Sequence, residues 1–176
     1  KRGKMEKFVK GKNINLRDVE ISDAQFILDL RTNEDKSAYL NKTEYNIEKQ
    51  TDYIKNYKKK SDEWYFVIES KEKEPLGTVR IYDIKDNSFS WGSWLVKDGA
   101  PTSTAIESAL LIYEFAFFSL NFAASHFEVR RKNERVRAFH ERFGAKIYEE
   151  TDEDVFYKYT REDYLKIRPK YLKRFL

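Results

Sequence analysis

The sequence predicts an α/β (α+β) fold with a mixed, mostly antiparallel sheet flanked by helices and followed by a basic C-terminal tail. Short β-rich runs and amphipathic runs follow one another in the order β-α-α-β-β-β-α-β-α-β. Neighbouring strands in the middle of the chain are joined by tight turns, whereas a long helix separates two later strands and favours a parallel pair. We expect one domain over 1–176, with a core at 12–160 and a tail at 161–176.

The first half of the chain predicts a strand, two helices and a hairpin. Ile14 and Leu16 alternate with polar residues in the first strand, and Ser22 with Gln25 forms a capping box before the first helix. The segment 32–45 has no clear period and is expected to be a loop or a broken helix. The expected elements are a strand at 13–19, helices at 24–31 and 47–60, and strands at 64–69 and 76–82.

The strongest periodic signal in the second half belongs to a helix over 105–120, whose apolar residues recur at helical spacing. Thr104 and Glu107 form a capping box at its start, and Pro101 enforces an extended entry. The other expected elements are a strand at 89–96, a loop at 97–104, a strand at 126–130, a helix at 133–143, a strand at 154–160 and a basic amphipathic tail at 161–176 interrupted at Pro169.

The loop before the 105–120 helix has the composition of an anion site. A strand that delivers small residues onto a helix N-terminus presents free N–H groups and the positive end of the helix dipole. Thr102, Ser103 and Thr104 add hydroxyl groups, and Gly99 lets a ligand approach the backbone. The alternative is an ordinary, well-capped helix.

Three side chains come into question as an acid or a base, and neither of the two glutamates among them is expected to be the catalytic base. His140 lies on the apolar stripe of its helix and points toward the core side, where an unshifted pKa near neutrality suits a general acid. The alternative for His140 is a satisfied core histidine. Glu128 alternates with apolar neighbours and is expected to face solvent, and Glu69 is expected on the hairpin surface.

Composition narrows the classes of function. The chain contains no cysteine, which excludes thiol nucleophiles and thiolate metal sites, and its two histidines exclude a His-rich zinc site, so no metal is expected. No apolar run approaches the roughly 18 residues of a membrane span. The net charge of +4 suits an anionic small ligand better than nucleic acid, and a cytoplasmic location is the default expectation.

The pattern Asn133-x-x-Val136-x-x-Phe139-His140-x-x-Phe143-Gly144-Ala145, together with the order of elements, resembles the GNAT acetyltransferase superfamily. The resemblance covers about 12–160 and is closest to the branch of ribosomal-protein-alanine and nucleotide-amino-sugar N-acetyltransferases. It implies a GNAT-like fold and direct N-acetyl transfer from acetyl-CoA (CoA) to a primary amine.

The resemblance also implies the residues of the cofactor site. The strand end is expected to meet the pantetheine amides and the loop to hold the pyrophosphate, while His140 protonates the departing thiolate. The loop lacks the basic residue and the central glycine of the family pattern, so Lys97 or another basic residue is expected to compensate. The expected cofactor-binding residues are Trp94, Leu95, Val96, Lys97, Pro101, Thr102, Ser103, Thr104, Ala105, Ile106 and Asn133.

The acceptor side follows from the same resemblance. Residues 31–45 resemble the corresponding segment of nucleotide-amino-sugar acetyltransferases, so a nucleotide-linked amino sugar is the expected substrate. Arg31, Tyr39 and Ser90 are the expected substrate-binding residues, although Arg31 also suits free carbonyls at a helix C-terminus. A protein or peptide N-terminal acetyltransferase, a non-catalytic CoA-binding module and a homodimer stay open.

Overall fold

The computed structural model describes residues 7–33 and 45–176. Its strands are β1 (Phe8–Lys10), β2 (Ile14–Asp18), β3 (Trp64–Ser70), β4 (Pro75–Lys85), β5 (Ser88–Val96), β6 (Ala124–Arg130), β7 (Lys146–Glu150) and β8 (Asp154–Thr160). Its helices are η2 (Ile21–Asp23), α1 (Ala24–Thr32), α3 (Ile47–Lys58), α4 (Thr104–Tyr113), η3 (Glu114–Ser119), α5 (Glu134–Phe143) and α6 (Arg161–Phe175).

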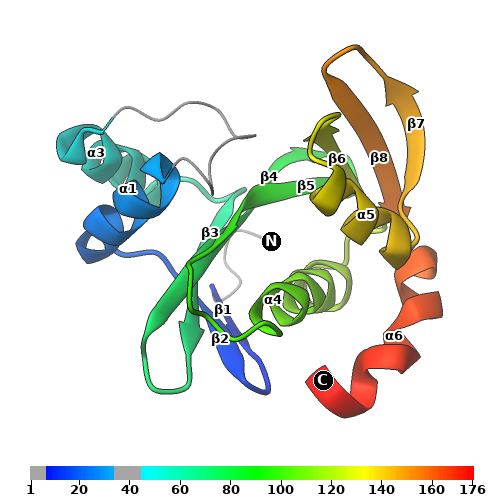
Figure 1. Ribbon diagram of the computed structural model, residues 1–176, viewed down its shortest axis with the longest axis horizontal. Coiled ribbons are helices and arrows are strands. Elements are labelled where there is room, and N and C mark those ends of the chain that lie inside the picture. The colour runs from blue at the N-terminus through cyan, green and yellow to red at the C-terminus, as the bar shows by residue number, and fades with distance from the viewer. Residues whose placement is uncertain (1–6, 34–44) are drawn as a thin grey trace.

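The strands form an 8-stranded sheet in the order β1-β2-β3-β4-β5-β6-β8-β7 (Figure 1). Among the described strands every neighbouring pair is antiparallel except β5 with β6. That parallel pair has only two partner positions, Ser88 with Ala124 and Phe89 with Ser125. Beyond them the two strands separate, so the sheet opens between β5 and β6. The predicted mixed, mostly antiparallel sheet is confirmed.

Helices cover both faces of the sheet, with α1 and α3 together at one side of the molecule and α4 in its centre (Figure 1). The alternation of β3 explains this layering. Phe66 and Ile68 pack in the large cluster that contains α4, whereas Tyr65 and Val67 pack in the smaller cluster beneath α1 and α3. The near-continuous apolar run of β3 is therefore buried on both sides.

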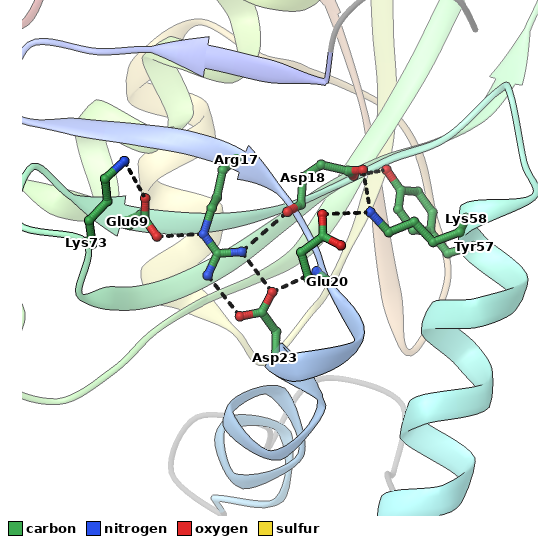
Figure 2. Close-up of polar contacts among 8 residues, drawn as sticks. All are labelled: Arg17, Asp18, Glu20, Asp23, Tyr57, Lys58, Glu69 and Lys73. Carbon is green, nitrogen blue, oxygen red and sulfur yellow. Dashed lines mark hydrogen bonds and ion pairs between the residues drawn. The ribbon is translucent and has the colours of Figure 1, made fainter.

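A polar network fastens α1 and α3 to the sheet (Figure 2). The guanidinium of Arg17 binds both carboxylate oxygens of Asp23, at 2.8 and 2.9 Å, and one oxygen of Glu69, at 2.6 Å. The hydroxyl of Tyr57, from α3, donates to Asp18 at 2.6 Å. Glu69 is only 4% exposed, so its expected place on the hairpin surface is wrong.

The first helix starts differently from the prediction. The structure places a capping box at Glu20 and Asp23, where η2 begins, instead of at Ser22 and Gln25. Asp23 accepts from the backbone N–H of Glu20 at 2.7 Å, and the Gln25 amide donates instead to Asp29. The carboxylate of Asp23 serves the cap because Arg17 holds it beside the chain entry.

The capping box predicted for α4 is also wrong. Ser103 is the N-cap and its side chain makes no cap hydrogen bond, while Thr104 is the first helical residue. Glu107 is 1% exposed and accepts from the backbone N–H and the side-chain amide of Asn13, both at 2.8 Å. The N–H groups of Asn13, in the β1–β2 turn, therefore bind the Glu107 carboxylate, which the sequence spacing predicts to cap the helix instead.

Four further elements differ from the prediction. The predicted helix 105–120 divides into α4 and the π-helix η3. The tail forms α6 over Arg161–Phe175 with Pro169 inside the helix, so the predicted interruption is wrong. Strands β1 and β7 are absent from the prediction, since β1 has three residues and every residue of β7 is exposed.

Candidate active site

A β-bulge shapes the opening between β5 and β6. Thr78 pairs with Leu95 and Arg80 pairs with Gly92, so β5 contains one residue more than β4 between these positions. Ser93 takes a φ of 47°, in the left-handed region, and its carbonyl accepts from the Thr78 hydroxyl at 2.8 Å. The bulge therefore turns the backbone of β5 at the mouth of the opening.

Two cavities meet at this opening. The smaller, of about 110 Å³, is enclosed by the bulge, by β6 and by α5. The larger, of about 790 Å³, lies between the end of β5, the start of α4 and α5. Trp94, Asn133 and Val136 line both cavities, so the two adjoin, and we call the pair the path from the loop before α4 into the sheet.

Most of the predicted cofactor residues gather around the larger cavity. Trp94, Leu95, Val96, Thr102, Ala105, Ile106 and Asn133 line it. Ser103 lines a neighbouring cavity of about 360 Å³ on the other side of the loop, together with part of α6.

Three predicted cofactor residues lie elsewhere. The ammonium of Lys97 pairs with Glu74, and the residue lines a separate pocket of about 190 Å³ at the end of α1. Thr104 is 1% exposed and its hydroxyl has no hydrogen-bond partner among the described residues. Pro101 lines none of these four cavities. Lys97 is therefore not placed to compensate for the basic residue that the loop lacks.

The caps of α5 account for the Asn and Gly of its sequence pattern. Asn133 is the N-cap, and its side-chain oxygen accepts from the backbone N–H of Val136 at 3.4 Å. Gly144 ends the helix with a φ of 104°, a conformation that glycine adopts without strain. The N-cap Asn133 therefore fixes the first turn of α5, where Asn133 and Val136 line both cavities.

His140 lies at the inner end of the path and lines the smaller cavity. Aromatic rings enclose it, with ring centroids 4.3 Å away at Phe127 and 5.4 Å away at Trp91. Its Nδ1 is buried and has no hydrogen-bond partner within the described part of the chain. Burial lowers the pKa of His140 to about 3, so the ring is neutral at physiological pH and the expected pKa near neutrality is wrong.

Glu128 also lines the smaller cavity, a position that sequence reasoning missed. Glu128 is exposed, as expected from its alternation on β6. The exposed side of β6 at this position lines the opening between β5 and β6. Tyr82 lies close by, because a side chain at Gly92 would come within 3.1 Å of its hydroxyl. Burial first, and then the charge of Glu128, raise the pKa of Tyr82.

Arginines and tyrosines continue from Tyr82 across the same face of the sheet. The guanidinium of Arg80 lies 4.1 Å from the centroid of the Tyr82 ring, and Arg80 is the register partner of Tyr65. Burial raises the pKa of Tyr65 to about 12, against a hydrogen bond and the charge of Arg31. We call Arg31, Tyr65, Arg80 and Tyr82 the arginine–tyrosine band.

Another predicted substrate residue, Ser90, lies beside this band as the register partner of Tyr82. The hydroxyl of Ser90 donates to the backbone carbonyl of His126 at 2.5 Å and so joins β5 to β6 where they begin to separate. Tyr39 lies outside the described residues. Within residues 7–33 and 45–176 there is no group of three acidic, histidine or cysteine side chains that could hold a metal ion, and no helix long and apolar enough to cross a membrane.

Comparison with known families identifies the class that this fold and site define. The family model described as "Acetyltransferase (GNAT) domain" matches residues 13–146. The chain therefore belongs to the GNAT acetyltransferase family, and it is an N-acetyltransferase. No curated protein sequence matches it.

Several solved structures are similar to this chain. FdhC, described as a nucleotide-linked sugar GNAT, is 38% identical, with a TM-score of 0.87 over 96% of this chain and 98% of its own. A GCN5-related N-acetyltransferase from Brucella melitensis is 14% identical, with a TM-score of 0.80 over 96% of this chain and 85% of its own. A mutant form of the spermidine N-acetyltransferase SpeG from Vibrio cholerae is 16% identical, with a TM-score of 0.72 over 87% of this chain and 96% of its own. The last two share the fold.

Proposed function

We propose that this protein transfers the acetyl group of acetyl-CoA to the amine of a nucleotide-linked amino sugar. The observation that carries the proposal is the arginine–tyrosine band, which leads from the α1 side of the sheet to the cavity lined by Glu128 and His140. Guanidinium groups suit a diphosphate, and the half-buried ring of Tyr82 suits a base or a sugar. The 38% identity with a nucleotide-linked sugar GNAT supports the same substrate class.

The residues around the two cavities fit acetyl-CoA. The larger cavity has the volume for an extended arm and carries Lys132, Arg135 and Arg142 on its lining, which suits an anionic nucleotide. The smaller cavity ends at the unpartnered, buried Nδ1 of His140, a polar atom that a ligand can satisfy. When bound, acetyl-CoA supplies the acetyl group as an activated thioester.

Glu128 is the proton acceptor of this proposal. A primary amine resembles lysine, with an unperturbed pKa of about 10.4, so it arrives as an ammonium group and must lose a proton before its nitrogen can attack a carbonyl carbon. The Glu128 carboxylate lines the cavity from β6 and remains open to solvent, so it can take that proton and return it to water.

His140 acts on the sulfur of the departing CoA and not on the amine. Because its ring is neutral, it cannot give up a proton as an imidazolium does at neutral pH. Its remaining N–H can donate a hydrogen bond to the sulfur on which negative charge develops, while the final proton comes from water. We therefore keep His140 as a catalytic residue, in the role of a hydrogen-bond donor.

The test is an acetylation assay across acceptor classes, with nucleotide-linked amino sugars, the same sugars without the nucleotide, peptides with free N-termini, and spermidine. We expect the nucleotide-linked sugars to have the highest kcat/KM. In Arg80→Gln, KM should rise for the nucleotide-linked sugar and stay within about twofold for the free sugar. Efficient acetylation of peptides or spermidine, with none of nucleotide-linked sugars, would refute the substrate assignment.

The same assay separates an enzyme from a non-catalytic CoA-binding module. A module retains CoA and shows no turnover with any amine. An enzyme of the proposed kind shows turnover that depends on Glu128, whose carboxylate has no part in binding the nucleotide end of CoA because it lines the inner cavity.

A further inference from the structure

The C-terminal helix returns to the loop that precedes α4. A cavity of about 360 Å³ separates the two, lined by Thr102, Ser103 and Ile106 on one side and by Lys170 and Arg174 of α6 on the other. Thr102 and Ile106 also line the 790 Å³ cavity. The space beside α6 therefore adjoins the path described above and shares Thr102 and Ile106 with it as a wall.

Lys170 and Arg174 bring positive charge to a loop that has little of its own. The single basic side chain of the 97–104 loop, Lys97, is paired with Glu74. Neither Lys170 nor Arg174 has an ion-pair partner within residues 7–33 and 45–176, whereas Arg168, earlier on α6, is held by Glu114 at 2.7 Å. The tail thus keeps two cations unneutralised at this cavity.

The position of the two cations is fixed by the packing of α6. Lys170 and Arg174 are four residues apart and so lie on one face of the helix, where their like charges repel each other in the absence of an anion. Tyr171 stacks on Phe143 at 5.5 Å between centroids, and Phe175 is 4% exposed, so the adjacent residues anchor this part of the helix.

The opposite wall of the cavity also favours an anion. It is formed by the N-terminal turn of α4, a helix of ten residues, where the dipole is positive. The N-cap Ser103 makes no side-chain cap hydrogen bond, and it lines the cavity together with Thr102. Polar groups on one wall and two cations on the other therefore face a common space.

We propose that Lys170 and Arg174, together with the N-terminal turn of α4, bind a phosphate group of CoA and replace the basic residue that the loop lacks. The inference rests on the proposed use of acetyl-CoA. The 3′-phosphate and the pyrophosphate of CoA share the chemistry that this site recognises, and they differ in the fragment that carries them.

The experiment measures binding of CoA and of 3′-dephospho-CoA by calorimetry to the full-length protein, without turnover. The test variant is Lys170→Gln/Arg174→Gln, and the matched control is Lys166→Gln/Lys173→Gln, which removes the same charge from exposed positions of the same helix. We expect the test variant to bind CoA at least tenfold more weakly than the control, at an unchanged thermal midpoint. Loss with CoA alone identifies the 3′-phosphate, and equal loss with both ligands identifies the pyrophosphate.

Equal CoA affinity in the test and control variants would overturn this inference and leave the proposed function intact. Failure of the unmodified protein to bind CoA would overturn both. Each single substitution, Lys170→Gln and Arg174→Gln, should lose part of the affinity, because both cations face the same cavity.

Discussion

The hydroxyl oxygen of Ser88 lies 2.6 Å from Nδ1 of His126, and Asp83 lies 3.1 Å from the other ring nitrogen. Burial acts to raise the pKa of Asp83, but the hydrogen bond with His126 and the charge of Lys85 outweigh it and lower that pKa. The three side chains join the β4–β5 turn to β6 at the short parallel pairing, so the imidazole holds the sheet together where it begins to open.

We predict that His126→Phe lowers the free energy of unfolding by about 1–2 kcal/mol, because two hydrogen bonds between strands are lost. Ser88→Ala should cost about 1 kcal/mol, and the double variant should cost less than the sum, since both changes break the same contact. Urea unfolding of the four proteins measures this coupling. Strict additivity would show that the two side chains do not stabilise each other.

Glu128→Gln should lower kcat by about 100-fold or more, because the amide cannot accept the proton of the acceptor ammonium. CoA affinity should stay within about twofold, and Glu149→Gln, an exposed change on β7, should leave kcat unchanged. A Glu128→Gln enzyme with activity within threefold of the parent would remove Glu128 from the mechanism.

His140→Phe should lower kcat by about tenfold, the amount expected for one hydrogen bond from a neutral donor. His140→Tyr should recover part of this, since its hydroxyl can donate. The measurement is kcat at saturating acetyl-CoA, with the thermal midpoint as a check on folding. An unchanged kcat in the folded Phe variant would make His140 a packing residue.

His140 also makes stability depend on pH. Its pKa falls from an ordinary value of 6.5 to about 3 on folding, so the unfolded chain takes up a proton below pH 6.5 that the native ring cannot accept. The native state therefore loses about 2 kcal/mol between pH 7 and pH 5 from this group alone. Denaturant unfolding at both values should show His140→Phe with a correspondingly smaller loss.

Arg17→Met should lower the free energy of unfolding by about 3 kcal/mol at neutral pH, because it leaves the carboxylates of Asp23 and Glu69 buried without their cation. Lys73→Met is the matched control, since Lys73 is largely exposed and 4.0 Å from Glu69, and should change stability by less than about 0.5 kcal/mol. Burial acts to raise the pKa of Asp23, but the hydrogen bond with Arg17 outweighs it and lowers that pKa, so the deficit of Arg17→Met should shrink in acid as this carboxylate becomes protonated.

Most of the element order, and the residues that line the larger cavity, could be predicted because both depend on local patterns. Apolar residues at helical spacing mark α4, and an Asn and a Gly at its two ends cap α5. The residues in 94–106 that were expected to meet a cofactor follow from the same strand-loop-helix order, and most of them line one cavity.

The acidic residues were harder to predict because their partners are distant in the sequence. Glu107 binds Asn13, and Glu69 binds Arg17, so neither carboxylate is where its neighbours in the sequence suggest. Alternation on β6 predicts that Glu128 is exposed, but only the separation of β5 from β6 shows that this face lines the candidate active site. Lys170 and Arg174, which we propose replace the missing basic residue of the loop, belong to the C-terminal helix. No motif near the loop in the sequence indicates them.

The strands β5 and β6 pair at only two positions, so the candidate active site lies where two parts of the sheet are joined by few backbone hydrogen bonds. On one side lie β1 to β5, on the other β6 to β8, and along the opening the backbone contributes no hydrogen bonds between them. A molecule bound in the opening touches both halves and takes the place of the missing ladder. Occupancy should therefore slow amide hydrogen exchange in β5 and β6 first, and every release of product loosens the sheet again.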